Sequence, residues 1–449
     1  MTQESLLRRL GTKEAAAIVV GSVIGTGVFL KTATMAQQTG SPALVLLAWL
    51  VAGLLSLAGA LSYAELGCLF PRAGGEYVYL KEAYGSGMGF LFGWTRFWIG
   101  SPGSIAAYAV GAATFLNGLI PLGDHRTLTA LVIIAIFTGL NCFSVAFGGR
   151  LQTFMTALKL IMILGLTAAI FIGGSTSGWH HLSTPESGGW LGWSGFGAAV
   201  LAALWAFDGW NNLPMAAGEI RDPGRVIPRA LGFGMLAVFL IYAFTNVAYF
   251  YALPFDEILT ANSNLHQDAL PVATKAVFSI FGAVGVTLLS AGFVFSAVGA
   301  MNGSILSSAR VPFAMARDGL FFRRLGEVSH RSRVPVTALV VQGIWSSILA
   351  LSGSFDQLTD YVVFASWIFY ALGAAAVLVL RRRRPDQERS FRTPFYPWLP
   401  LIFLVCSVLL LANTLWTSPL QSLIGLGFIL MGIPAYLFFR GTSKGMTNS

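Results

Sequence analysis

Long apolar segments recur along the whole chain, and they limit what it can fold into more than any other feature. Each has about the 20 residues that cross the hydrocarbon core of a bilayer as a helix, or more, and the third and eighth are the longest. Only 10% of the 449 residues are charged, whereas a soluble domain carries roughly 25%. The sequence therefore predicts an all-α integral membrane protein. We expect twelve transmembrane helices, at residues 14–38, 43–70, 86–119, 128–147, 153–174, 193–219, 229–253, 272–307, 335–353, 358–380, 396–417 and 420–440.

Lysine and arginine gather on one side of the predicted membrane. With the N-terminus in the cytoplasm, 23 of the 28 Lys and Arg residues lie in cytoplasmic segments, as the positive-inside rule requires. The opposite loops carry mostly acids: Asp124, Glu186, Asp256, Glu257, Asp268 and Asp356. The net charge of +9 thus reflects topology and not a nucleic acid partner. We expect a multi-pass protein of the cell's inner (plasma) membrane with both termini in the cytoplasm.

Several classes of membrane protein fit the sequence poorly. An ion channel needs a polar pore lining or a filter, and neither is visible. A membrane enzyme needs clustered ligands or acid–base pairs, but the three cysteines and five histidines show no ligand spacing. A sensing receptor would usually carry a further signalling domain, and both tails are short. We therefore expect a transporter that is not an enzyme and uses no metal or cofactor.

The first apolar segment contains the stretch "GSVIGTGVFL", residues 21–30, with three glycines in seven positions. Each glycine costs a helix interior about 1 kcal/mol relative to alanine. One interpretation is close helix packing, since Gly21 and Gly25 form a G-x-x-x-G pattern. The other is an unwound joint in the middle of the membrane.

The sixth apolar segment is interrupted in the same way. In "LWAFDGWNNLPMAAGE", residues 204–219, the pair Asp208-Gly209 falls mid-span and Asn211 and Pro214 follow. Such residues favour turns over helix interiors, and an ionisable residue at membrane depth is a functional candidate. Interruptions five spans apart indicate an inverted repeat of five plus five helices with a site between the halves.

Two such joints would suit a zwitterion. The N-terminus of an outer half-helix near Thr26 and Gly27 offers amides and the positive end of a helix dipole, which favour a carboxylate. The C-terminal ends of half-helices, around Val23, Ile24 and residues 205–207, offer carbonyl groups for an ammonium group. An α-amino acid carries both charges.

At these residues the chain resembles the amino acid–polyamine–organocation superfamily. Within it the chain is most similar to the L-amino acid transporter family, and to bacterial serine/threonine exchangers. The matching stretches are "GSVIGTGVFL", "YAELGCLFPRAGGEYVYLKEAYG", "FDGWN", "GEIRDPGRVIPRA", "TNVAYF" and "SSARVPFAMARDGL". The resemblance implies a five-plus-five inverted-repeat fold with broken helices 1 and 6, alternating access, and amino acid exchange. The expected organisation is an N-terminal segment at 1–13, repeats at 14–174 and 193–380, two further helices within 396–440, and a tail at 441–449.

The family's site residues map onto matching positions. The glycine-rich joint corresponds to the predicted carboxylate cradle, a gating aromatic corresponds to Trp205, and a polar residue that contacts substrate or braces the joint corresponds to Asn211. An "NGS" element corresponds to Asn302, Gly303 and Ser304. Together with the joints, this predicts substrate contacts at Val23, Ile24, Gly25, Thr26, Gly27, Trp205, Ala206, Phe207, Asp208, Gly209 and Asn211.

Lys159 lies about 10 Å into its span, at 1.5 Å per residue. Snorkelling could bring its charge close to water. The family carries a lysine here, where sodium-coupled relatives of the fold bind sodium, which implies a sodium-independent exchanger of neutral amino acids. The alternative is proton exchange by this lysine in a proton-coupled importer of amino acids or polyamines.

The sequence departs from the family's pattern at two places, and it carries two carboxylates near span ends. The loop at 117–127 lacks the cysteine that joins many eukaryotic members to a second subunit, so we expect no disulfide-linked partner. Asp208 replaces a glycine of many animal members, which leaves the side-chain preference open. Glu65 and Glu219 lie near span ends, where we expect them to bind loop arginines or form an inner gate.

Overall fold

A computed structural model describes residues 6–121, 123–173, 178–183, 192–263, 265–266, 269–352 and 355–447. Within them the chain is helical, with a single isolated β-bridge between Leu10 and Ile220, so the predicted all-α class is confirmed. The predicted loop acids Glu186 and Asp268, residue 174, and residues 1–5 and 448–449 lie outside the described part.

The helices follow one another with short connections. Their bounds are α1 Thr12–Val23, α2 Gly27–Thr39, α3 Pro42–Leu69, α4 Glu76–Tyr84, α5 Ser86–Thr95, α6 Ser101–Asn117, α7 Arg126–Asn141, α8 Val145–Gly173, α9 Gly192–Ala206, α10 Asn212–Met215, α11 Pro223–Ala252, α12 Phe255–Leu259, α13 Val272–Ser308, α14 Arg310–Arg317, α15 Val336–Ser352, α16 Phe355–Arg383, α17 Trp398–Thr417 and α18 Pro419–Thr447.

Among the described residues, nine helical stretches are long and apolar enough to cross a membrane, counting α1 with α2 as one. Three shorter apolar helices, α7, α9 and α15, lie within or overlap expected spans. The protein is therefore a multi-pass membrane protein.

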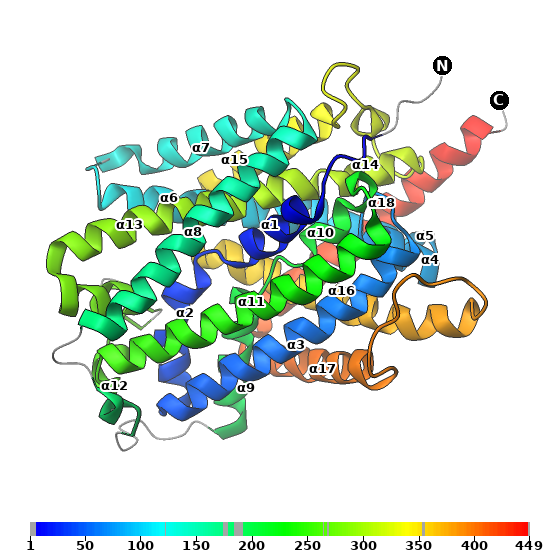
Figure 1. The fold of residues 1–449 in the computed structure, drawn as a ribbon. Helices are drawn as coiled ribbons and strands as arrows, with labels where there is room; N and C mark the ends of the chain where they lie inside the picture. The colour runs from blue at the N-terminus through cyan, green and yellow to red at the C-terminus, as the bar shows by residue number, and fades with distance from the viewer. Residues whose placement is uncertain are drawn as a thin grey trace.

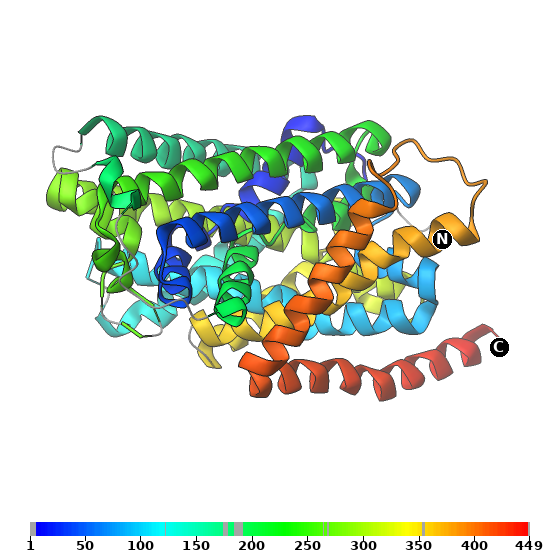
Figure 2. The same ribbon diagram turned by 90° about the horizontal axis from the view of Figure 1, so that it is seen from below.

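The long helices lie side by side in one elongated bundle (Figure 1). The short helices α1, α2 and α10 occupy its centre, where α1 packs against α8, α11 and α13. The last two helices, α17 and α18, lie at the edge (Figure 2), where they pack against α16 and against α3 and α5 respectively. The segment before α1 and the end of α18 lie at the same end of the bundle (Figures 1 and 2).

The third predicted span is not a regular α-helix. A π-helical turn at Arg96–Gly100 separates α5 from α6. Pro102 has no N–H to donate to the carbonyl of Trp98, four residues earlier, and that carbonyl accepts a hydrogen bond from the Trp345 indole N–H at 2.7 Å. The irregular turn thus replaces a lost helical bond with a contact to α15.

Two element ends differ from the sequence prediction. Helix α18 continues to Thr447, so most of the segment expected as a tail at 441–449 is helical. Hydropathy marks where a helix leaves the bilayer, but polar residues can continue the helix in water. Likewise the loop expected between the second and third spans contains a helix of its own, α4.

Candidate functional site

Two breaks in the helices meet at the centre of the bundle. Helix α1 ends at Val23 and α2 begins at Gly27, so residues 24–26 lie outside both helices, and Ile24, with ψ of 89°, departs from helical geometry. Helix α9 ends at Ala206, and residues 207–211 form a turn before α10. Both interruptions lie at the positions where glycine, aspartate or asparagine residues disfavour a continuous helix.

The two joints are in direct contact. Gly209 has φ of +114°, and a Cβ there would lie 2.9 Å from the carbonyl oxygen of Ser22. A Cβ at Gly27 would lie 2.7 Å from Cα of Ala206. Both distances are shorter than van der Waals contact allows, so glycine is required for this approach of two backbones.

The end of α1 is held by a buried lysine. The Nζ atom of Lys159 on α8 donates hydrogen bonds to the carbonyl oxygens of Gly21 at 2.8 Å, Ile24 at 2.6 Å and Ser296 at 2.9 Å. Its side chain is fully buried, so it does not snorkel. All three N–H donors of the ammonium have backbone acceptors on α1, the joint and α13.

Other side chains satisfy the neighbouring carbonyl groups. The Tyr242 hydroxyl on α11 lies 2.9 Å from the carbonyl oxygen of Val23 and 3.0 Å from that of Ala206, so one donor serves the ends of both half-helices. The Ser296 hydroxyl lies 3.2 Å and 3.0 Å from the carbonyl oxygens of Ile24 and Gly25. The Ile24 carbonyl oxygen therefore faces two side-chain donors. Those of Val23 and Ala206 share the Tyr242 hydroxyl, and that of Val23 also accepts a hydrogen bond of 2.8 Å from the Gly25 amide.

The start of α2 is the polar counterpart of these carbonyl groups. The first amides of a helix, here at Gly27 and Val28, have no acceptor within the helix. Beside them the Thr26 hydroxyl is fully buried and has no hydrogen-bond partner among the described residues. A Cβ at Gly25 would lie 3.0 Å from the ring of Tyr108. The arrangement offers hydrogen-bond donors to an anion in a confined space.

The second joint carries two polar side chains with different partners. The Asp208 carboxylate accepts a hydrogen bond of 2.6 Å from the Tyr370 hydroxyl on α16. The Asn211 amide donates to the Glu76 carboxylate on α4 at 2.9 Å, and its own oxygen has no partner in the described chain. Asn211 thus links the joint to the segment between α3 and α5.

Two of the "NGS" residues of α13, Asn302 and Ser304, have different hydrogen-bond partners. Ser304 Oγ lies 3.5 Å from the Asn212 amide, whose oxygen accepts a bond from Arg96 at 3.2 Å. The Asn302 amide instead donates to Gln152 on α8 at 2.7 Å. The structure therefore brings Ser304 near the second joint but places Asn302 in a brace between helices.

Trp205 lies over the start of α2. Its ring is 3.3 Å from where a Cβ of Gly27 would be, and the Lys31 Nζ lies 4.7 Å from the centre of its indole. Lys31 also lines a cavity of about 480 Å³ between α2, α6 and α13, whose walls include Phe115 and Phe293. The indole thus contacts both the first joint and a lysine of the cavity wall.

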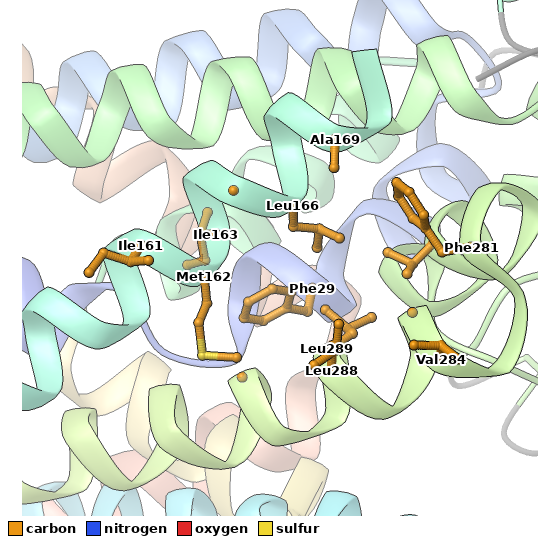
Figure 3. A pocket seen from close by; sticks show the side chains of 14 residues that line it. Phe29, Ile161, Met162, Ile163, Leu166, Ala169, Phe281, Val284, Leu288 and Leu289 are labelled. Atoms are coloured by element: carbon orange, nitrogen blue, oxygen red, sulfur yellow. The ribbon is translucent and has the colours of Figure 1, made fainter. Parts of the chain in front are cut away.

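A second cavity lies away from this site (Figure 3). It has a volume of about 420 Å³ between α2, α8 and α13, and its walls include Phe29, Met162, Leu166 and Leu289. All of its labelled side chains are apolar (Figure 3). A zwitterion would lose its hydrogen bonds there, so this cavity does not fit an amino acid.

The two carboxylates at span ends are paired with arginine, as expected. Glu65 accepts hydrogen bonds from Arg381 at 2.9 Å and 2.7 Å. Glu219 accepts from Arg310 at 2.8 Å and 3.0 Å, and both side chains are buried.

Several residues at the joints have no signal in the sequence that singles them out. Tyr242, Ser296 and Tyr370 lie within ordinary apolar spans, where a tyrosine or serine is unremarkable. Glu76 does have a signal, because a carboxylate follows two glycines in "AGGEYVY". The resemblance includes this stretch but implies no role for Glu76.

With this geometry in place, comparison with known proteins decides the family. A family model described as amino acid permease matches residues 10–439. The chain belongs to the amino acid permease family. This places it in the amino acid–polyamine–organocation superfamily, as the resemblance implied.

Individual permeases are similar along their whole length. The serine/threonine exchanger SteT of Bacillus subtilis is 34% identical over 434 residues, which cover 96% of each chain. The mouse b(0,+)-type amino acid transporter 1 is 30% identical over 441 residues, 97% of this chain and 88% of the relative. The human large neutral amino acids transporter small subunit 2 is 30% identical over 449 residues, which cover 96% of this chain and 80% of the relative.

These relatives are transporters. This protein is therefore a membrane transporter of the amino acid permease family and not an enzyme.

Proposed function

We propose that this permease exchanges neutral L-amino acids across the membrane by alternating access, without sodium. The observation that carries the proposal is the contact between the two joints. The start of α2 presents amides and the Thr26 hydroxyl, which has no partner in the described part of the chain, and the ends of α1 and α9 present carbonyl groups. A carboxylate and an ammonium group on one carbon match these two sets.

In this proposal the cradle at Gly25, Thr26 and Gly27 holds the substrate carboxylate. Carbonyl groups around Val23, Ile24 and residues 205–207 receive its ammonium group. Those of Val23 and Ile24 each already accept from two protein donors, so those of Ala206 and Phe207 are the main acceptors. Asn211 contacts the substrate or braces the joint, and Trp205 closes the site from the outside.

Sodium independence rests on Lys159. Its ammonium lies at the carbonyl groups of the first joint, where a bound cation would otherwise be needed to hold the end of α1. A fixed positive charge makes that cation unnecessary.

The expected neutral substrate agrees with the names of relatives, which include a serine/threonine exchanger and a large neutral amino acids transporter subunit. The proposal further includes repeats at 14–174 and 193–380, twelve spans, an inner-membrane location with cytoplasmic termini, and no disulfide-linked second subunit.

One observation favours a second candidate, a proton-coupled importer of amino acids or polyamines. Lys159 is buried, and within the described chain its ammonium hydrogen-bonds to backbone oxygens only. A buried ammonium without a carboxylate is a group that can release a proton when its surroundings change.

Uptake into proteoliposomes separates these candidates. Labelled serine, alanine, leucine and arginine are offered outside, and unlabelled amino acid is loaded inside or left out. Exchange predicts that internal substrate raises uptake of the neutral amino acids and that choline can replace sodium. Equal uptake into empty, unenergised vesicles would indicate a uniporter, and strong dependence on an inward proton gradient would favour the second candidate.

A further inference from the structure

A third cavity lies at the end of the bundle that carries the N-terminal segment. Its volume is about 450 Å³, and its walls come from the segment before α1, the loop before α4, α4 itself and α14. Four of the lining side chains are cationic, namely Arg8, Arg72, Lys81 and Arg317, against one carboxylate, Asp318. None of these residues contacts the joints in any interaction described above.

Two of the four cations already have acidic partners. Lys81 pairs with Asp318 at 2.6 Å, and Arg72 pairs with Glu82 at 2.5 Å. Glu82 also pairs with Arg384 at 2.7 Å, so one carboxylate is shared between two guanidinium groups. The walls therefore keep an excess of positive charge even where ion pairs form.

The other two cations have no acidic partner in the described part of the chain. Arg8 donates a long hydrogen bond of 3.5 Å to the carbonyl oxygen of Pro71, and Arg317 lies 5.9 Å from the ring centre of Phe313. A topology signal requires arginine on this face of the membrane, but it does not require two unpaired guanidinium groups on the walls of one cavity.

We propose that this cavity binds a phosphate-bearing anion, with the guanidinium groups of Arg8 and Arg317 as its main ligands. A guanidinium presents a planar fork of donors that matches phosphate oxygens. A carboxylate can serve two guanidinium groups, as Glu82 does, but a phosphoryl group pairs with such forks as well and can carry more negative charge to balance the excess of arginine on these walls. A concave site lined by one sign of charge also focuses the field on a ligand of the opposite sign.

The phosphate can come from two sources with the same chemistry. One is the headgroup of an anionic phospholipid in the adjacent leaflet, and the other is a soluble phosphate compound. The proposal does not depend on the substrate of the transporter, because its ligands lie apart from the joints.

Thermal unfolding of the purified protein in a neutral detergent tests the proposal. Three probes are titrated at low ionic strength: dioctanoyl phosphatidylglycerol, dioctanoyl phosphatidylcholine and inorganic pyrophosphate. Potassium chloride of equal ionic strength is the blank. We expect phosphatidylglycerol, pyrophosphate or both to raise the midpoint in a saturable way, and phosphatidylcholine and chloride to leave it unchanged.

Variants then assign the effect to the cavity. In Arg8→Gln/Arg317→Gln the apparent affinity is expected to fall at least tenfold. Arg317→Lys keeps the charge but loses the fork, and is expected to give an intermediate affinity. Arg225→Gln is the matched control, because Arg225 is an exposed arginine that does not line the cavity.

The outcomes separate the sources and can overturn the proposal. A response to phosphatidylglycerol alone identifies the lipid headgroup, a response to pyrophosphate alone identifies a soluble anion, and a response to both identifies the phosphoryl group itself. No saturable response of the wild type to either probe would overturn the proposal. So would an equal response in the double variant, or an equal loss in Arg225→Gln.

Discussion

The Nζ atom of Lys159 lies 2.6 Å from the carbonyl oxygen of Ile24. These residues are 135 positions apart in the chain, and their contact closes the end of α1 where its helical hydrogen bonds stop. Two more carbonyl oxygens, of Gly21 and Ser296, complete the shell of the ammonium. A single charge thus ties α8 to the first joint and to α13.

Removing this ammonium should unbalance the transport cycle. Lys159→Ala takes one donor from each of three buried carbonyl groups, and only that of Ile24 keeps a second side-chain donor, the Ser296 hydroxyl. This loosens the joint and shifts the populations of the two orientations. We expect exchange to slow about tenfold or more, equivalent to roughly 1.4 kcal/mol, with apparent affinity changed differently on the two sides. Counterflow assays in both directions measure this.

Lys275→Ala is the control, because in the described structure the ammonium of that lysine hydrogen-bonds to Glu257 and Thr260 at α12 and not to the joints. Wild-type exchange should persist when choline replaces sodium. A sodium requirement of the wild type would contradict the role given to Lys159. If Lys159→Ala lost proton-driven uptake but retained exchange, Lys159 would instead be assigned to proton coupling.

Side chains at Gly27 should block the carboxylate cradle. Even a Cβ there would collide with Ala206, so Gly27→Val must separate the two joints. We expect substrate affinity to fall at least tenfold while the protein remains folded, as checked by substrate-dependent thermal shifts and gel filtration. Gly139→Ala is the control, since a Cβ at Gly139 meets no atom within 4 Å. Unchanged affinity in Gly27→Val would leave only a packing role for this glycine.

Trp205 should matter for transport more than for folding. Its indole lies against Gly27 of the first joint and against Lys31, which lines the cavity, and alanine would remove the bulk that we propose closes the site. We expect Trp205→Ala to lose most exchange activity with a nearly unchanged unfolding midpoint. Trp416→Ala, at a tryptophan that is 86% exposed, should retain activity. Exchange at the wild-type rate in Trp205→Ala would place the gate elsewhere.

The Glu219–Arg310 pair should contribute far more to stability than the ion pairs at the surface. The side chains of Glu219 and Arg310 are 0% and 1% exposed, so Glu219→Gln leaves a buried charge without its partner. We expect a loss of about 3–5 kcal/mol in the free energy of unfolding, measured by denaturant titration in detergent. Asp222→Asn breaks the exposed pair with Arg225 and should cost less than about 1 kcal/mol. Equal losses in the two variants would contradict this ranking.

Glu82 should give the protein an acid-sensitive contribution to stability. Burial alone would raise the pKa of Glu82, but hydrogen bonds and positive charge from Arg72 and Arg384 outweigh it and lower the pKa below 4.5. The unfolded chain therefore binds the proton first, and the stabilisation is present above pH 4.5 and lost as the pH falls through the lowered value.

The measurement is the difference in unfolding midpoint between wild type and Glu82→Gln across this range. We expect a constant advantage of the wild type above pH 5 that shrinks below about pH 4. An advantage that is independent of pH would show that the charge of Glu82 is not what stabilises this contact.

Hydropathy, the positions of lysine and arginine, and two weak stretches were enough to predict a helical membrane protein with breaks near Gly25 and Asp208. These signals are local, because apolar side chains partition into lipid and glycine or aspartate weakens a helix wherever the residue lies. Hydropathy does not predict where α18 ends, since it changes at the bilayer surface while the helix continues.

The tertiary structure alone decided which groups surround the joints. Tyr242 and Ser296 come from helices whose sequences carry no signal of a site. Asn302, which was expected near the substrate, donates its hydrogen bond to Gln152 on α8 instead. A carbonyl group freed from a helix must find a donor, because lipid offers none. Which donor it finds depends on how helices far apart in the chain pack against each other, and no local pattern of residues contains that information.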